Sequence, residues 1–214
     1  MTMCVLATGN RHKLAELGRM LDEEAITLEV VAPRRFGEPP EIPETGDSFV
    51  ANAVRKARGL AAWLRAQDCP GDALVLADDS GISVDAFDGA PGVTSARFAG
   101  EPSDDVANNR KLVDELRARG LEASGAHYSC VLALVRVDGG AITGEGDDLV
   151  VFDGRWDVEV RTAARGEGGF GYDPHAWIDG GARTVAELDA VDKAAVSHRG
   201  RALRALVQWW RARA

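Results

Sequence analysis

Cysteine is scarce in this chain, and the few cysteines form no recognisable pattern. There are three in 214 residues, Cys4, Cys69 and Cys130, an odd number without a Cys-x-x-Cys spacing. Cys4 and Cys130 lie inside apolar runs typical of strands, where a free thiol behaves as a small hydrophobic side chain. We therefore predict free thiols, buried at these two positions, in a protein of a reducing compartment.

The sequence contains no long hydrophobic run, and we expect no secretion signal. No segment approaches the roughly 18 apolar residues that a membrane span requires. Residues 1–6 are too short an apolar stretch for a signal peptide, and they lack the basic n-region that a signal peptide has. The expected location is therefore the cytoplasm, and a membrane is not an expected partner.

Basic residues are also fewer than acidic residues, 25 against 34. The formal net charge is −9 at pH 7 and the pI is near 5.0. This balance argues against binding to a nucleic-acid polymer, because surfaces for such polymers are normally basic. A small anion can still bind to an acidic protein where local positive charge or a metal ion is present. A phosphate-binding site in this chain therefore requires specific basic side chains or a bound metal ion.

What the sequence does contain is an alternation of strand-like and helix-like segments. A strand over residues 3–7 and a tight turn precede a helix on which Leu14, Leu17 and Leu21 recur at helical spacing. The other predicted elements are strands at 28–31, 74–77, 128–137 and 149–160, helices at 48–67, 104–119 and the C-terminus, a helical region starting at a capping box over 184–187, and a surface loop at 33–43. The pattern predicts an α/β protein with a mixed sheet, organised as two lobes rather than two independent domains.

A first polar group lies where the first strand gives way to the first helix. Helix N-terminal N–H groups and the positive end of the helix dipole favour an anion at such a junction. Gly9 permits close approach, Thr8 and Asn10 can add hydrogen bonds, and Lys13 adds a positive charge. The Walker spacing is absent, and the same pattern taken alone is typical of an ordinary turn followed by a surface lysine.

A second polar group is the run Asp78-Asp79-Ser80-Gly81, which we expect to close a buried strand. Adjacent residues on a strand point to opposite faces, so the two aspartates need not act as a pair. A third acid, Glu44, precedes the second helix. Carboxylates are the ligands that Mg²⁺ prefers, although Asp-Ser-Gly is also a good turn sequence, and both interpretations stay open here.

A third polar group lies near the C-terminus. Phe170, Tyr172 and Asp173 belong to a glycine-rich loop over residues 168–174, and Lys193, His198 and Arg199 follow it. An aromatic face beside directed donors suits a planar, polar-edged molecule such as a nucleobase. Lysine and arginine can only donate, so they favour a 6-oxo purine over adenine. The alternatives are a glycine-rich turn with a core aromatic and a solvated or capping histidine.

Taken together, the motifs resemble the inosine/xanthosine triphosphate pyrophosphatase family of nucleotide house-cleaning enzymes. They occur in the order of the family and extend over nearly the whole chain. The matching segments are Thr8-Gly9-Asn10-x-x-Lys13, Glu44-Thr45-Gly46-x-Ser48-Phe49-x-x-Asn52-Ala53-x-x-Lys56-Ala57, Ala77-Asp78-Asp79-Ser80-Gly81, Gly89-Ala90-Pro91-Gly92 with Ser95-Ala96-Arg97, residues 168–174 and residues 193–200.

The resemblance implies Mg²⁺-dependent hydrolysis of ITP, dITP and XTP to the monophosphate and diphosphate. It also implies a single domain over residues 1–214, an elongated two-lobed fold with the substrate cleft between the lobes, and a homodimer. Glu44 and Asp79 would bind the metal, Asp79 would accept the proton of the attacking water, and Ser80 would contact substrate. The implied substrate-binding residues are Thr8, Gly9, Asn10, Arg11, His12 and Lys13 for the triphosphate, and Phe170, Gly171, Tyr172, Asp173, Lys193, His198 and Arg199 for the base.

Two segments depart from the family pattern. Residues 157–166 lack the glycine and proline that the family tends to show there, and residues 175–177, His-Ala-Trp, replace an apolar aromatic stretch. Neither segment contains a proposed contact, so the departures bear on loop shape and substrate preference rather than on the reaction.

Two other functions compete with this one. A phosphomonoesterase of the haloacid-dehalogenase type would use Asp78 as nucleophile, but the required Asp-x-Asp-x-Thr/Val pattern is missing. A nucleotide-binding sensor would bind without hydrolysis, and the acids together with Lys13 argue against it. The released product distinguishes the three.

Overall fold

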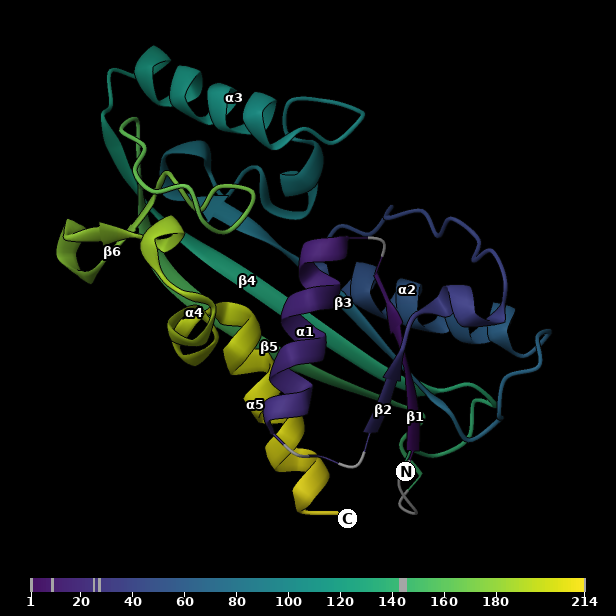
Figure 1. The fold of residues 1–214 in the computed structure, drawn as a ribbon. Coiled ribbons are helices and arrows are strands. Elements are labelled where there is room, and N and C mark those ends of the chain that lie inside the picture. The colour runs from purple at the N-terminus through teal and green to yellow at the C-terminus, as the bar shows by residue number, and fades with distance from the viewer. Residues whose placement is uncertain (1, 9, 25, 27, 143–145, 214) are drawn as a thin grey trace. The chain divides into compact units, whose positions relative to one another are not determined.

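The computed structural model describes residues 2–8, 10–24, 26, 28–142 and 146–213 (Figure 1). The strands are β1 (Thr2–Ala7), β2 (Leu28–Val31), β3 (Leu74–Val84), β4 (Ala123–Arg136), β5 (Leu149–Arg161), β6 (Ala176–Ile178) and β7 (Arg183–Thr184). The α-helices are α1 (Arg11–Glu23), α2 (Phe49–Leu64), α3 (Asp105–Ala118), α4 (Ala190–Val196) and α5 (His198–Arg211). Short 3₁₀ helices are η1 (Pro33–Phe36), η2 (Asp85–Phe87), η3 (Gly92–Arg97), η4 (Asp179–Gly181) and η5 (Val185–Glu187).

One sheet contains the seven strands in the order β2-β1-β3-β4-β5-β6-β7. β1 pairs in parallel with β2 and β3, whereas β5, β6 and β7 pair antiparallel. The predicted α/β class with a mixed sheet and flanking helices is therefore confirmed. The chain divides into two compact units: residues 1–79, 130–153 and 201–214 form the first, and residues 80–129 and 154–200 form the second.

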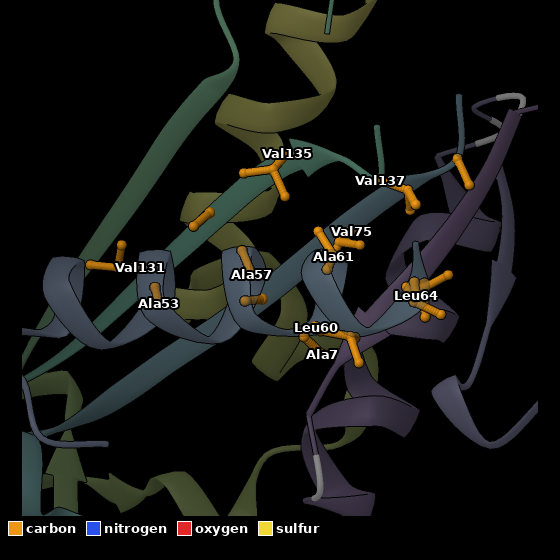
Figure 2. Packing of buried hydrophobic residues seen from close by; sticks show 14 residues of the cluster. Ala7, Ala53, Ala57, Leu60, Ala61, Leu64, Val75, Val131, Val135 and Val137 are labelled. Carbon is orange, nitrogen blue, oxygen red and sulfur yellow. The ribbon is translucent and has the colours of Figure 1, made fainter. Parts of the chain in front are cut away.

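The first unit has a core in which α2 packs against the sheet (Figure 2). Ser48 caps this helix, because its hydroxyl accepts a hydrogen bond from the Ala51 N–H at 3.2 Å. The apolar face of α2 is largely alanine, and small side chains let the helix approach the valines of β3 and β4 closely. The buried members shown are Ala53, Ala57, Leu60, Ala61, Leu64, Val75, Val131, Val135 and Val137, with Ala7 of β1.

The opposite face of the same strands is also apolar and buried. Side chains alternate along a strand, so Cys4 and Leu6 of β1 and Leu74 and Leu76 of β3 point away from α2. In Figure 1, α1 and α5 lie next to each other, and the Arg211 guanidinium at the end of α5 donates to the Glu24 carbonyl oxygen at 2.6 Å. A sheet apolar on both faces explains why these strands read as continuous hydrophobic runs.

The second unit has its own core, formed between α3, the second half of β3 and the first half of β4. It includes Ile82, Leu112, Leu116, Tyr128 and Trp156. Asp104 caps α3, since its carboxylate accepts from the N–H groups of the first turn. Each unit therefore buries apolar surface of its own.

Three sequence expectations need correction. The strand predicted over residues 128–137 begins five residues earlier, because β4 spans Ala123–Arg136. The strand predicted to end at residue 77 continues to Val84, so Asp78 and Asp79 lie inside β3 rather than in a turn. The capping box at Thr184 and Glu187 is formed, but it opens only the 3₁₀ turn η5, because Leu188 returns to extended backbone. Cys4 and Cys130 are buried free thiols, as predicted. In the part of the chain that the structure describes, every helix is too short or too polar to span a membrane.

Candidate active site

The turn between β1 and α1 is organised by Asn10. Its Oδ1 accepts from the backbone N–H groups of His12 at 2.9 Å and Lys13 at 3.2 Å, so Asn10 is the N-cap of α1. The Asn10 N–H donates to Thr8 Oγ1 at 3.2 Å. Gly9 and the side chain of Arg11, both predicted to bind the triphosphate, lie outside the described residues. The His12 side chain is exposed.

Lys13 does not extend into solvent as a surface lysine would. Its Nζ lies 2.7 Å from Asp78 Oδ1, and the Asp78 side chain is fully buried. The Cys130 thiol donates to the other oxygen, Oδ2, at 3.2 Å. The buried acid at the middle of β3 therefore determines where the first helix directs its positive charge.

Asp79 points to the other face of β3 and meets a lysine of α2. Lys56 Nζ donates to Asp79 Oδ1 at 2.7 Å, to Glu44 Oε1 at 2.9 Å and to the Asp78 carbonyl oxygen at 2.6 Å. Three acceptors match the three protons of an ammonium group. The two predicted metal ligands, Glu44 and Asp79, are therefore brought together around one cation.

The protonation states of this cluster follow from burial and pairing. Burial raises the pKa of Asp79 above its ordinary value, and the attraction of Lys56 offsets only part of that effect. Burial lowers the pKa of Lys56, but Asp79 and Glu44 raise it, and the net shift is upward. Lys56 therefore stays charged near neutral pH, and Asp79 is more easily protonated than a solvated aspartate.

The donor set around Asp79 fits a magnesium ion. Asp79 is only 4% exposed, yet its Oδ2 has no hydrogen-bond partner, and a buried unpaired carboxylate oxygen is costly. Mg²⁺ commonly takes one or two carboxylates and completes its shell with water and substrate phosphates. Among the described residues there is no cluster of three or more acidic, histidine or cysteine side chains arranged for a metal, and Glu44 and Asp79 are the two carboxylates that would hold the ion.

Lys56 is a site residue that the sequence prediction missed. It falls on the apolar face of α2, between Ala53 and Ala57 and ahead of Leu60. A lysine on an otherwise buried helical face was the available signal, because a buried ammonium requires acidic partners.

In the second unit, Asp173 is the centre of a polar network. Its Oδ2 accepts from Lys193 Nζ at 2.8 Å and from the Phe170 N–H at 2.9 Å, and its Oδ1 accepts from the Tyr128 hydroxyl at 3.2 Å. Burial is the largest cause that raises the pKa of Tyr128, and the nearby Asp173 carboxylate raises it further. Tyr128 therefore remains a neutral donor to Asp173, a role that the sequence did not reveal.

The predicted donors gather around the aromatic residues of this unit. Lys193 Nζ lies 4.5 Å and the Arg199 guanidinium carbon 5.9 Å from the centre of the Phe170 ring. Arg199 is 1% exposed and donates to Ser80 Oγ at 2.8 Å. His198 stacks on Tyr128 with ring centres 4.8 Å apart and planes within 10°. Except for Tyr172, the predicted base-recognition residues lie in or beside this polar network.

Tyr172 has a different environment from its neighbours. Its ring belongs to the hydrophobic core of the second unit, and its hydroxyl donates to the Ser95 carbonyl oxygen at 2.8 Å. The alternative of a core aromatic in a glycine-rich turn therefore describes the side chain of Tyr172. Gly169 has a φ of +73°, and a Cβ there would clash with the Asp173 carboxylate, so a glycine is needed for that carboxylate to fold back onto the loop.

The predicted residues belong to two sets. The set in the first unit comprises Thr8, Asn10, His12, Lys13, Glu44 and Asp79, and the set in the second comprises Ser80, Phe170, Gly171, Tyr172, Asp173, Lys193, His198 and Arg199. Asp79 and Ser80, which are consecutive on β3, belong to different sets. Ser80, which accepts a hydrogen bond from Arg199, is therefore the residue that directly follows Asp79 of the acidic cluster in the chain.

Known proteins resemble this chain over nearly its full length. Residues 4–209 match the sequence model of the Ham1 family. A protein named dITP/XTP pyrophosphatase from Chromobacterium violaceum is 48% identical over 205 residues, covering 95% of this chain and 94% of the relative. A protein of the same name from Bacillus anthracis is 41% identical over 207 residues, covering 96% and 95%.

Solved structures agree with the sequence comparison. A HAM1 protein from Coxiella burnetii has a TM-score of 0.83 and 35% identity, covering 99% of this chain and 100% of that one. A nucleoside-triphosphatase / dITP/XTP pyrophosphatase from Mycobacterium abscessus has a TM-score of 0.69 and 40% identity, covering 96% and 98%. The resemblance seen in the motifs is thus confirmed, and the chain belongs to the Ham1 family.

Proposed function

We propose that this protein is a nucleoside triphosphate pyrophosphatase that hydrolyses ITP, dITP and XTP to the monophosphate and diphosphate. Relatives that are 41–48% identical over nearly the whole chain carry the name dITP/XTP pyrophosphatase. The structural observation that carries the proposal is Asp79, a buried carboxylate with one oxygen bound to Lys56 and the other without a hydrogen-bond partner. The reaction would remove deaminated purine nucleotides from the nucleotide pool.

In this proposal, residues of the first unit bind the triphosphate. The turn over residues 8–13 offers helix N-terminal N–H groups and the charge of Lys13. Glu44 and Asp79 would hold Mg²⁺, which when bound offsets the charge of the phosphate oxygens. Lys56 places a further positive charge at the same two carboxylates. Local cations of this kind are what an acidic protein needs in order to bind a polyanion.

Asp79 is the proposed proton acceptor for the attacking water. A water oxygen forms a bond to the α-phosphorus, the bond from that phosphorus to the bridging oxygen breaks, and diphosphate leaves with the bond electrons. The water proton passes to Asp79. Because burial raises the pKa of Asp79, its carboxylate is a stronger base than a solvated aspartate would be.

Residues of the second unit bind the base in this proposal. Phe170 offers a flat face, and Lys193 and Arg199, both within 6 Å of its ring centre, offer only donors. A 6-oxo purine presents an acceptor to such donors, whereas the 6-amino group of adenine would present a further donor to them. Placing donor against donor in a buried site makes that discrimination large. His198 and Asp173 complete the proposed base-binding set, with the backbone of residues 170–173.

A nucleotide panel tests the proposal. The purified protein would be incubated with Mg²⁺ and ITP, dITP, XTP, GTP or ATP, and diphosphate and orthophosphate would be measured separately, with chelated reactions as controls. Diphosphate from the deaminated nucleotides, with ATP at least about a hundredfold slower in kcat/KM, is the expected result. Orthophosphate alone would indicate a phosphomonoesterase, and binding without turnover would indicate a sensor.

A homodimer is the assembly that we propose for this chain, by analogy with the family. The expected result is a mass of about twice 22.8 kDa by light scattering after gel filtration. A monomer at micromolar concentration would contradict it.

A further inference from the structure

Helix α3 holds one residue of the glycine-rich loop, Gly171, by both of its backbone polar groups. The Gly171 N–H donates to Asp105 Oδ2 at 2.8 Å, and the Gly171 carbonyl oxygen accepts from Asn109 Nδ2 at 2.8 Å. Asp105 and Asn109 are four residues apart, so they lie on the same face of the helix. The helix thus supplies one acceptor and one donor, matched to the two polar groups of a single residue.

The orientation of the Asn109 amide is set by this contact. Its Nδ2 is directed at Gly171, while its Oδ1 is buried without a hydrogen-bond partner. The opposite orientation would place Oδ1 against the Gly171 carbonyl oxygen, and two acceptors would then face each other. Asn109 therefore donates one hydrogen bond to Gly171, while its own Oδ1 has no partner. This orientation indicates that the Asn109 side chain serves to hold the loop.

The backbone of Gly171 is held by hydrogen bonds to α3, whereas the next residue, Tyr172, packs in the core of the second unit. Gly171 has a φ of +62°, and a Cβ there would meet no atom within 4 Å. A surface pocket of about 370 Å³ lies beside the end of the loop and is lined by side chains of α3, Asn109 among them, together with Pro174 and His175. At Gly171 itself, which has no side chain to pack, the contacts with α3 are the two hydrogen bonds to Asp105 and Asn109.

Gly171 lies between the two loop residues that the proposed function assigns to the base. Phe170 precedes it, and Asp173 follows two residues later and accepts from the Phe170 N–H. A shift of the Gly171 peptide would therefore move both the aromatic face and the carboxylate that holds Lys193. Displacements of about 1 Å are sufficient to change substrate discrimination strongly.

We propose that Asp105 and Asn109 are positioning residues that determine base selectivity by holding the Gly171 peptide in place. They touch neither substrate nor metal in this scheme, and they act through Phe170 and Asp173. The inference rests on the proposed function, because it assigns a selectivity role to a loop that contacts the base.

Paired variants of Asp105 and Asn109, which together form a clamp on Gly171, test the inference. Asp105→Ala removes the acceptor, whereas Asp105→Asn keeps an oxygen in the same place and should largely restore the contact. Asn109→Asp replaces the donor with an oxygen that faces the Gly171 carbonyl. Glu115→Ala is the matched control on α3, since Glu115 pairs with Arg119 at the C-terminal end of the helix.

The expected result is a change in KM and selectivity rather than in kcat. For Asp105→Ala and Asn109→Asp, KM for ITP should rise and the ITP-over-ATP ratio of kcat/KM should fall, each by about tenfold, the loss expected for one charge-assisted or well-placed hydrogen bond. Asp105→Asn and Glu115→Ala should stay within about twofold of the wild type. Deuterium exchange over residues 168–174 should be faster in the first two variants only.

Two outcomes would overturn the inference. One is wild-type selectivity in both Asp105→Ala and Asn109→Asp, and the other is an equal fall of kcat for every nucleotide with unchanged selectivity and a lower melting temperature. If the wild type releases no diphosphate from ITP, the proposed function fails. Unchanged exchange over residues 168–174 would then overturn the clamp on its own, independently of activity.

Discussion

Asp78 and Asp79 are consecutive on β3, yet each binds a lysine from a different helix. Asp78 Oδ1 lies 2.7 Å from Lys13 Nζ of α1, and Asp79 Oδ1 lies 2.7 Å from Lys56 Nζ of α2. The alternation of side chains along a strand accounts for the separation. Neighbouring acids therefore act in separate surroundings, and substitutions at the two positions should have different effects.

Neutralising the two aspartates should separate chemistry from stability. Asp79→Asn should lower kcat for ITP by about 10²–10⁴-fold, because the proton acceptor is lost while the side-chain shape is kept. Asp78→Asn should lower the free energy of unfolding by about 3 kcal/mol, because it breaks a buried ion pair and leaves Lys13 uncompensated. Steady-state kinetics and urea unfolding of both variants check this. Near wild-type turnover in Asp79→Asn would exclude it as the base.

Removing the ammonium group from the acidic cluster should strengthen cation binding there. Lys56 bridges Glu44 and Asp79, so its positive charge competes with a divalent ion for the same two carboxylates. Lys56→Met should therefore bind Mg²⁺ about tenfold more tightly in the absence of nucleotide, seen as a larger rise of melting temperature with Mg²⁺. Arg58→Met, an exposed position on the same helix, is the control. A weaker Mg²⁺ response in Lys56→Met would contradict the competition.

Truncating the buried arginine should reduce base selectivity. Arg199→Ala removes a donor near Phe170 and the hydrogen bond to Ser80 Oγ. KM for ITP should rise and the ITP-over-ATP ratio should fall by about tenfold or more, since fewer buried donors then reject an amino group. Arg201→Ala, an exposed position two residues on, should leave the ratio unchanged. The same ITP-over-ATP ratio in Arg199→Ala as in the wild type would argue against the base site.

His127 should make the fold less stable in mild acid. Burial is the largest cause that lowers its pKa below 6.5, Arg155 lowers it further, and Asp157 and Asp85 oppose the shift. The folded state then binds a proton less readily than the unfolded state, so this contribution to stability is present above the unfolded pKa and is lost as pH falls below it. Urea unfolding at about pH 7.5 and about pH 5 should show a smaller decline in His127→Gln than in the wild type. Equal declines would refute this.

Much of the local structure could be predicted because it depends on neighbouring residues. The spacing of Leu14, Leu17 and Leu21 predicted α1, and Asp104 and Ser48 mark the starts of α3 and α2, as capping requires. The β2 bounds agree with the prediction, and Pro33, which cannot donate to a strand ladder, follows two residues after the strand. In contrast, nothing local distinguishes a strand that ends at Asp78 from one that continues through it, since the continuation depends on partners elsewhere in the sheet.

The sequence by itself determined the α/β class, the family and the chemical types of the candidate site residues, because periodicity, capping and motif order are properties of short segments. Only the tertiary structure decided the partners: Lys13 with Asp78, Lys56 with Asp79, Tyr128 with Asp173, and Gly171 with α3. These contacts join residues between 23 and 66 positions apart. They form because a buried charge or peptide group must find a complementary group within about 3 Å, and which group is that close depends on how the strands and helices pack.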